Sequence, residues 1–225
     1  MNYKIILDRE ALYSFVRWLP DLEEGECYYV ALFARKKYHE SAKNDKSQCK
    51  RLTATDKEWL IRKLEQLEVP LGCYTNKDGT AVANEALALY ISVNPRSFAR
   101  AQRRVLCRLA DTIAKGEAWM NPTTIALSEI QKAKSRTCWV DFDFDDVTWE
   151  ETRGAVETLL NPGAYQVLNT RSGFHLLVAP HEVHEDYRKT WHQGLTRLPG
   201  CDQRGDNLIP VAGCCQGGYV PRLLS

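Results

Sequence analysis

The chain has 225 residues, of which 44% are apolar and 26% are charged, as in ordinary globular proteins with a sizeable core. Its 30 lysines and arginines balance 29 aspartates and glutamates, so net charge neither indicates nor excludes a nucleic-acid partner. No apolar run reaches the roughly 18 residues that a membrane span needs. The first residues also lack the features of a signal peptide, so we expect a cytoplasmic protein without a membrane partner.

The eight cysteines are scattered or adjacent, and none forms the C-x-x-C pair that is typical of structural zinc sites. Because thiols stay reduced in the cytoplasm, we expect buried free thiols and no structural zinc. His181 and His184 have a spacing that suits metal binding on a helix. We favour the simpler interpretation that they lie in a solvent-exposed loop leading into a helix.

The first half of the chain predicts a mixed α/β subdomain over residues 1–136. Thr55 and Glu58 have the spacing of a capping box, which predicts the start of a helix. An arginine-rich helix is expected after Pro95. The other expected elements are strands at 3–7, 27–34 and 87–93 and a helix at 8–18.

The second half predicts the element order β-α-β-β-α-β, which is that of the ferredoxin-like unit. We therefore expect an α+β fold with a ferredoxin-like (RRM-like) core over 137–225 beside the N-terminal α/β subdomain. Thr148 and Glu151 predict a capping box at the start of the first helix. In this unit the first and third strands are central neighbours, and the last strand flanks the first. The elements are expected at 137–143, 148–160, 164–170, 174–179, 184–198 and 207–213.

Two acids on the first predicted strand of this core are candidates for a metal site. Side chains alternate between the faces of a strand, so Asp141 and Asp143 point the same way. Two carboxylates this close repel each other unless a cation lies between them, and oxygen ligands suit Mg²⁺ or Mn²⁺. Cys138-Trp139-Val140 predicts a buried central strand, where unpaired carboxylates are costly. We therefore favour a metal site over the charged face of an edge strand.

Two further motifs accompany this strand. Ser172-Gly173 forms a predicted turn before His175. The Ser172 hydroxyl, the backbone N–H groups of the turn and the His175 imidazole can together hold a triphosphate, and Arg171 adds positive charge. This pattern alone is weak evidence for a phosphate site, and its predicted position beside the aspartate strand strengthens that interpretation. Later in the chain, either Asp202 or Asp206 can supply a third carboxylate, and the sequence leaves the choice open.

These motifs in this order resemble the archaeo-eukaryotic primase superfamily, and the chain is similar in size to small primase-polymerases of phages and mobile elements. The family pattern is a strand ending in D-x-D, a small-residue–x–His motif, and a third aspartate before a strand. The resemblance covers about 137–221 and extends to 1–136 only as a mixed lobe. The chain departs from the family at 210–214, where many relatives have R-x-P-G-T. The matching segments are VDFD at 140–143, SGFH at 172–175, and CD at 201–202 or GD at 205–206.

The resemblance implies a template-directed nucleotidyltransferase, a DNA primase, a polymerase or both, that acts in DNA replication. It implies two Mg²⁺ or Mn²⁺ ions held by Asp141, Asp143 and the third aspartate, either Asp202 or Asp206. The implied partners are a single-stranded DNA template, an NTP or dNTP, and a helicase or replicative polymerase supplied in trans, in a bacterial or phage-infected cell. The implied nucleotide ligands are Arg171, Ser172, Gly173, His175, Arg35 and Lys36, and the nucleic-acid ligands are Arg96 and Arg100.

Two other functions remain open. A metal-dependent nuclease or an end-joining-type transferase uses the same metals, although a nuclease does not need the triphosphate ligands Ser172 and His175. A non-catalytic module that binds single-stranded nucleic acid is the third hypothesis. Aromatic side chains on the open sheet face would favour that module, whereas the predicted face carries acids that repel phosphate. The basic residues Arg35, Lys36 and Arg96 fit ordinary surface charge as well as they fit phosphate contacts.

Overall fold

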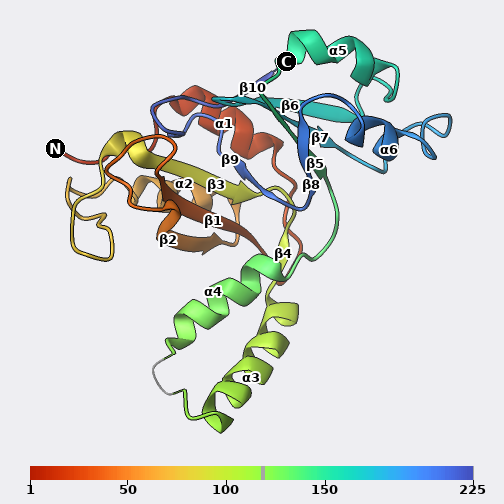
Figure 1. Ribbon diagram of the computed structural model, residues 1–225. Coiled ribbons are helices and arrows are strands. Elements are labelled where there is room, and N and C mark those ends of the chain that lie inside the picture. Colours follow the sequence, from red (N-terminus) through yellow and green to blue (C-terminus); the bar gives the residue numbers. More distant parts are fainter. Residues whose placement is uncertain (118–119, 225) are drawn as a thin grey trace.

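In the part of the chain that the structure describes, two antiparallel sheets and six α-helices make up an α+β fold, the class that the sequence predicts (Figure 1). The computed structural model describes residues 1–117 and 120–224. The first sheet has the order β2-β1-β3-β9, with the short β4 beside β1. Its strands are β1 (Glu26–Arg35), β2 (Asp45–Ala54), β3 (Leu87–Ser92), β4 (Arg96–Ser97) and β9 (Leu208–Pro210).

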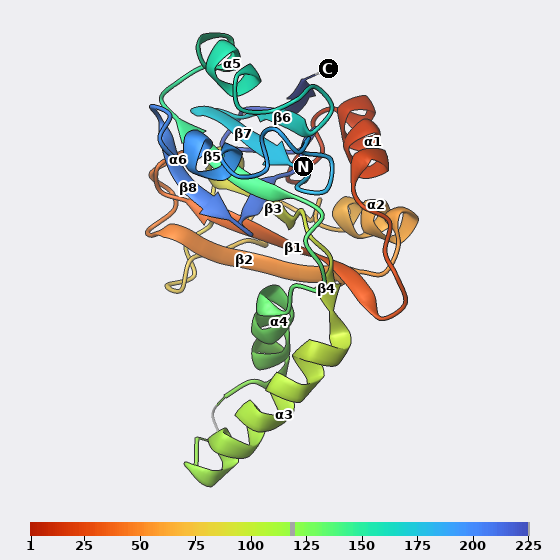
Figure 2. The same cartoon turned by 90° about the vertical axis from the view of Figure 1, so that its right-hand side faces the viewer.

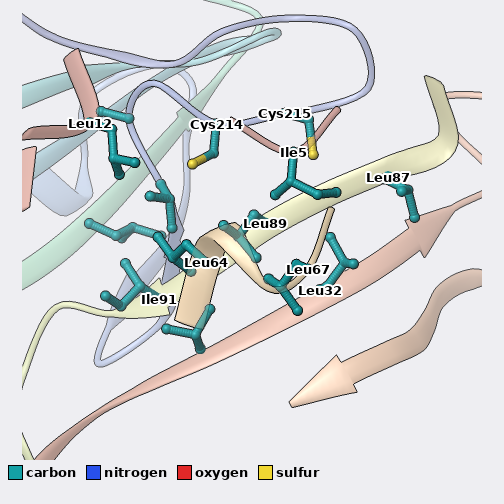
Figure 3. Close-up of a cluster of buried hydrophobic side chains, with 14 of the residues drawn as sticks. Ile5, Leu12, Leu32, Leu64, Leu67, Leu87, Leu89, Ile91, Cys214 and Cys215 are labelled. Carbon is teal, nitrogen blue, oxygen red and sulfur yellow. The ribbon is translucent and has the colours of Figure 1, made fainter. Parts of the chain in front are cut away.

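Helices α1 (Arg9–Trp18) and α2 (Lys57–Glu65) pack on one face of the first sheet. Along β1, the even-numbered Tyr28, Val30 and Leu32 belong to a core that includes residues of α1 and α2. Figure 3 shows Leu64 of α2 lying near Leu89 of β3 within this core. The odd-numbered side chains of β1 therefore point to the opposite face, away from these helices.

The second sheet has the order β10-β6-β7-β5-β8, and all of its neighbouring strands are antiparallel. Phe142 and Phe144 of β5 pack in a second core with residues of both helices that follow in the chain. The predicted capping box of Thr148 and Glu151 is confirmed at the start of α5. The elements are β5 (Val140–Asp145), α5 (Trp149–Glu157), β6 (Tyr165–Asn169), β7 (Gly173–Val178), α6 (Trp191–Thr196), β8 (Cys201–Gly205) and β10 (Arg222–Leu224).

Three sequence predictions about elements are wrong. Residues 3–7 form no strand, and Ile6 alone among them makes an isolated bridge, to Cys214. Helix α2 is capped by Asp56, whose carboxylate accepts from the backbone N–H of Trp59, and not by Thr55. The strand that flanks β5 is β8, because the apolar side chain of Ile209 fills the first core and draws β9 into the first sheet.

A helical hairpin projects from the first sheet, as the two views show (Figures 1 and 2). It consists of α3 (Phe98–Ala114), which is the predicted arginine-rich helix, and α4 (Pro122–Lys132). Tyr29 of β1 donates a hydrogen bond to Gln131 of α4, and Arg51 of β2 donates one to Ser128. The base of the hairpin is thus attached to the face of the first sheet that α1 and α2 leave open. None of the helices in the described residues has the length and apolar character needed to cross a membrane.

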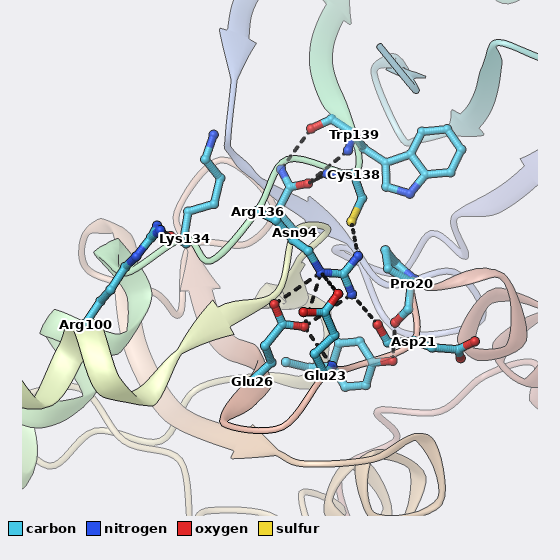
Figure 4. A network of polar contacts seen from close by, with 11 residues as sticks. Pro20, Asp21, Glu23, Glu26, Asn94, Arg100, Lys134, Arg136, Cys138 and Trp139 are labelled. Atoms are coloured by element: carbon cyan, nitrogen blue, oxygen red, sulfur yellow. Dashed lines mark hydrogen bonds and ion pairs between the residues drawn. The ribbon is translucent and has the colours of Figure 1, made fainter. Parts of the chain in front are cut away.

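Buried polar contacts hold the segment between α4 and β5 in place (Figure 4). The side-chain oxygen of Asn94 accepts from the backbone N–H groups of Cys138 and Trp139 at 2.8 and 2.9 Å. The Arg136 guanidinium contacts the carboxylate of Glu26 at the start of β1. These contacts fix where β5 begins, and therefore fix the position of its acids relative to the first sheet.

Candidate functional site

A cavity of about 300 Å³ lies between the open faces of the two sheets. One wall is acidic and comes from β5, which contributes Asp143 and Asp145. The other wall is basic and comes from β1, β2 and the loop after β1. The principal residues that line the whole cavity are Phe33, Arg35, Lys37, Tyr38, Lys46, Tyr90, Gln131, Asp143, Asp145, Ser172, His175, Gln203 and Asn207.

Asp141, His175 and Asp143 form a row of side chains on β5 and β7. The two strands pair so that Asp143 lies opposite His175. The Nδ1 atom of His175 lies 2.8 Å from Asp141 Oδ1, and its Nε2 atom lies 3.5 Å from Asp143 Oδ1. Asp141 therefore orients the imidazole, and the opposite ring nitrogen is turned toward the acid that lines the cavity.

The charges in this row depend on burial and on one another. Burial disfavours a charged His175, but the neighbouring carboxylates of Asp141 and Asp143 outweigh it and raise the imidazole pKa to about 9. Burial also raises the pKa of Asp143, although the nearby His175 opposes that shift. A protonated imidazole beside two carboxylates leaves this part of the row with a net negative charge, which favours a cation in the cavity.

Asp141 does not line the cavity, contrary to the expectation that it pairs with Asp143 there. It is fully buried because its end of the open face packs against the first core: its β-sheet partner Leu177 belongs to that core, as does Leu168 of β6. The sequence gives no sign of this packing, since it does not show that the open face is partly covered by the other sheet.

Asp145 lines the cavity, and the sequence analysis did not include it. It lies on the same face as Asp143, and its Oδ1 accepts a hydrogen bond of 2.9 Å from the Ser172 hydroxyl. The sequence pattern could have identified Asp145, because the alternation of acids along VDFDFD continues to residue 145. The predicted Ser172-Gly173 turn therefore does meet the acidic strand, and its hydroxyl contacts a carboxylate.

Gly173 is required where the turn touches β5. A Cβ atom added there would lie 1.9 Å from the carbonyl oxygen of Phe144, so the two strands would have to separate. We expect Gly173→Ala to lower the free energy of unfolding by about 2 kcal/mol. Gly154 in α5 is the matched control, because nothing lies within 4 Å of its added Cβ. Gly154→Ala should stabilise the protein by roughly 0.5–1 kcal/mol in urea unfolding, and equal effects of the two changes would contradict the contact.

The basic wall differs from the sequence prediction in two of its three residues. Arg35 lines the cavity as expected, but both of its outer branches are engaged, with Asp45 at 3.2 Å and with the Tyr90 hydroxyl at 2.8 Å. Lys37 and Lys46 line the cavity in place of Lys36, which is exposed elsewhere. Lys46 has φ 74° at an irregularity in the β1–β2 pairing, a local geometry that the sequence does not reveal.

Other basic residues expected to bind phosphate lie outside the cavity. Arg171 packs its guanidinium 5.0 Å from the centre of the Tyr38 ring and donates to the carbonyl oxygen of Gly217. Arg96 is buried, with only 2% of its side chain exposed, and pairs with a carboxylate. It is therefore not placed at the surface for nucleic acid, contrary to the prediction, because it is buried and Asp206 accepts hydrogen bonds from its guanidinium. Arg100 lies on the exposed part of α3.

Neither candidate for the third acid lines the cavity. Asp206 accepts from the guanidinium of Arg96 and, at 2.9 Å, from the side-chain amide of Asn94. Those contacts occupy both of its oxygens. Asp202 is exposed on β8, and the neighbouring Gln203 lines the cavity instead. In this structure the acids that share the cavity are therefore Asp143 and Asp145.

The donor set bears on which metal the site can hold. Within residues 1–117 and 120–224, no group of three His, Cys, Asp or Glu side chains is arranged to hold a metal ion by itself. Mg²⁺ commonly binds through one or two carboxylates, with substrate phosphates and water completing its shell. The pair Asp143 and Asp145 fits that mode. The buried Oδ2 atom of Asp141, which lacks a hydrogen-bond partner among the described residues, fits a nearby cation or water.

The site thus combines an acidic wall, a basic wall and a histidine oriented by a buried aspartate, all positioned by two sheets. Such a cavity suits an anionic ligand that binds together with a divalent cation. No protein-family model matches the chain, and searches of curated proteins and of solved structures found no match either.

Proposed function

We propose that the protein is a divalent-metal-dependent nucleotidyltransferase that adds nucleotides to a strand paired with a template, as a DNA primase, a DNA polymerase or both. The observation that carries this proposal is the cavity in which Asp143 and Asp145 face Lys37 and Lys46. A nucleoside triphosphate with its bound cation needs both walls: carboxylates for the cation and ammonium groups for the phosphates. A ligand of a single charge sign would be repelled by one of the two walls.

Asp143 and Asp145 are the residues that would hold Mg²⁺ or Mn²⁺, alone or as a pair of ions. A bound cation supplies a lower pKa for the attacking hydroxyl and neutralises charge on the triphosphate and the leaving pyrophosphate. Ser172 holds Asp145 through its hydroxyl, and so limits the orientations of that carboxylate. Asp141 has the same positioning role for His175.

The basic wall would bind the triphosphate. Lys37 and Lys46 are both exposed at the cavity, so their ammonium groups can contact phosphate oxygens. The Lys37 ammonium also lies 5.4 Å from the centre of the Tyr38 ring. Arg35 and His175 also line the cavity, and His175 lies beside Asp143. The aromatic residues Tyr90 and Phe33 provide the less polar part of the same wall, where the sugar or base would lie.

The arrangement of the second sheet supports the resemblance to archaeo-eukaryotic primases. Its four strands β5, β6, β7 and β8 have the spatial order β8-β5-β7-β6, all antiparallel. We propose that this is a ferredoxin-like unit, since that topology requires the first and third strands at the centre and the fourth beside the first. It brings the D-x-D strand next to the SGFH hairpin, as the motif order implies. In this proposal the additional acid that binds the metal is Asp145, in place of Asp202 or Asp206.

The deciding experiment is extension of a labelled primer on single-stranded DNA with Mg²⁺ or Mn²⁺, beside reactions without primer. Template-dependent products support the polymerase, and products without primer add primase activity. Shortening of the labelled strand without synthesis would replace this proposal by the nuclease. Tight binding with neither reaction, under either metal and with NTPs and dNTPs both tested, would leave the binding module.

The basic wall yields a prediction about substrate binding. Replacing Lys37 and Lys46 together by methionine should raise the KM for the nucleotide about 30-fold to 150-fold, because each lost ammonium–phosphate contact corresponds to roughly 1–1.5 kcal/mol. Lys36→Met is the matched control, since this neighbouring lysine does not line the cavity, and its KM should stay within about twofold of wild type. Steady-state extension at varied nucleotide concentration measures both. Equal effects of the two changes would remove the basic wall from the site.

A further inference from the structure

The helical hairpin of α3 and α4 carries an excess of positive charge. Residues 98–134 contain seven lysines and arginines and three acids. Asp111 pairs with Lys115 near the tip, Glu129 pairs with Arg108, and Glu117 lies beyond the end of α3, away from the base of the hairpin. Toward the base of the hairpin lie four cations that make no ion pair within the described part of the chain. We call these four residues the basic side of the hairpin: Arg100, Arg103, Arg104 and Lys134.

Two of these arginines are held in fixed positions without being neutralised. Arg100 donates to the backbone carbonyl of Lys134 at 2.5 Å, and Arg104 donates to that of Lys132 at 3.3 Å. Figure 4 shows the side chain of Arg100 beside Lys134. Carbonyl oxygens orient a guanidinium but carry only partial charge, so most of the positive charge remains available to an external anion. Arg103 is exposed, and Arg100, one turn before it on α3, is also basic.

The basic side begins next to the candidate site. Gln131 of α4 lines the cavity, and the next residue, Lys132, supplies the carbonyl that Arg104 contacts. The base of α4 is bonded to the same face of the first sheet that forms the basic wall. A polyanionic strand that leaves the cavity past Gln131 therefore meets a second set of cations without crossing a region of exposed acids in the hairpin.

We propose that the basic side of the α3–α4 hairpin binds the phosphodiester backbone of the single-stranded DNA template and guides it to the cavity. This inference rests on the proposed function for the identity of the strand, and on charge complementarity for the contact itself. The opposite side of α3 carries the apolar Phe98, Val105 and Leu106 beside α4. A phosphate backbone would not bind that apolar side, so the template is assigned to the arginines.

The test compares two triple variants that lose equal charge. Arg100→Gln/Arg103→Gln/Arg104→Gln removes the basic side, and Arg153→Gln/Arg188→Gln/Arg197→Gln removes three exposed arginines beside α5 and α6. Fluorescence anisotropy of a labelled single-stranded oligonucleotide, without nucleotide or metal, measures binding at several salt concentrations. The hairpin variant should bind the oligonucleotide at least about tenfold more weakly. Its plot of log association constant against log salt concentration should be less steep by about 2, as expected for three lost phosphate contacts.

The control variant should keep the affinity and slope of wild type. Equal weakening of both triple variants, or no DNA binding by wild type, would overturn the inference. Because Arg100 and Arg104 also contact backbone, Arg103→Glu provides a variant without those contacts, and it should weaken binding while the melting temperature stays unchanged. Duplex DNA and single-stranded RNA of equal length are the competing ligands, and tighter binding of either through the same arginines would reject the single-stranded template.

The outcome separates this inference from the proposed function. If wild type binds DNA through the hairpin and synthesises nothing, the nucleotidyltransferase fails while the hairpin remains a DNA-binding surface. If wild type extends primers and the hairpin variant binds and extends equally well, the inference fails and the function stands.

Discussion

Asp143→Asn is expected to reduce template-dependent synthesis about 1,000-fold while the protein keeps its fold. Asp143 lines the cavity, lies opposite His175 on the neighbouring strand, and is one of the two carboxylates available to a cation there. Losing one ligand removes several kcal/mol of stabilisation of the developing charge, and each 1.4 kcal/mol corresponds to about tenfold in rate. Single-turnover primer extension with Mg²⁺ and with Mn²⁺ measures the effect.

Asp202→Asn is the matched control, because it makes the same chemical change on an exposed residue of β8, the strand next to β5. We expect it to extend primers within about threefold of wild type, because Asp202 is exposed and does not line the cavity, and water screens exposed charges. If Asp202→Asn loses synthesis and Asp143→Asn keeps it, Asp202 is the metal ligand and the arrangement of the cavity acids proposed above is wrong. Asp145→Asn should follow Asp143→Asn, which would establish the acid that the sequence motif did not include.

The parts of the site that follow local rules could be predicted from the sequence. The alternation of side chains along a strand placed Asp141 and Asp143 on one face, and the tight turn placed Ser172 at the head of the next strand. These are properties of a strand and a turn, and they do not depend on the rest of the molecule. The capping box of Thr148 follows the same logic, since its two hydrogen bonds lie within one helical turn.

The parts that depend on how the two sheets meet could not be predicted. Asp141 is buried because Leu177 and Leu168 on its face pack into the first core, and nothing near Asp141 in the sequence indicates that contact. Lys46 reaches the cavity through an irregular strand pairing that has no sequence signature. Strand β8 was missed for a different reason: CDQRG is mostly polar, so it lacks the apolar alternation that marks a strand.

Asp206→Ala is expected to lower the free energy of unfolding by about 3 kcal/mol, because it leaves the buried guanidinium of Arg96 without its carboxylate. The Arg96 side chain is 2% exposed and that of Asp206 is 23% exposed, so water cannot replace the lost partner fully. Asn94 also loses an acceptor for its amide. Urea unfolding monitored by tryptophan fluorescence gives the change, and the control Asp202→Ala should stay within about 0.5 kcal/mol of wild type.

A second variant separates a structural role of Asp206 from a metal-binding one. Arg96→Met/Asp206→Ala removes both charges, and it should be more stable than Asp206→Ala alone, because an apolar side chain in place of a buried cation leaves no uncompensated charge. Primer extension at a temperature where both variants are folded should then remain within about tenfold of wild type, since the acids of the cavity are intact. If Asp206→Ala is fully folded but inactive, Asp206 is instead a metal ligand. Its ion pair with Arg96 would then break when the metal binds.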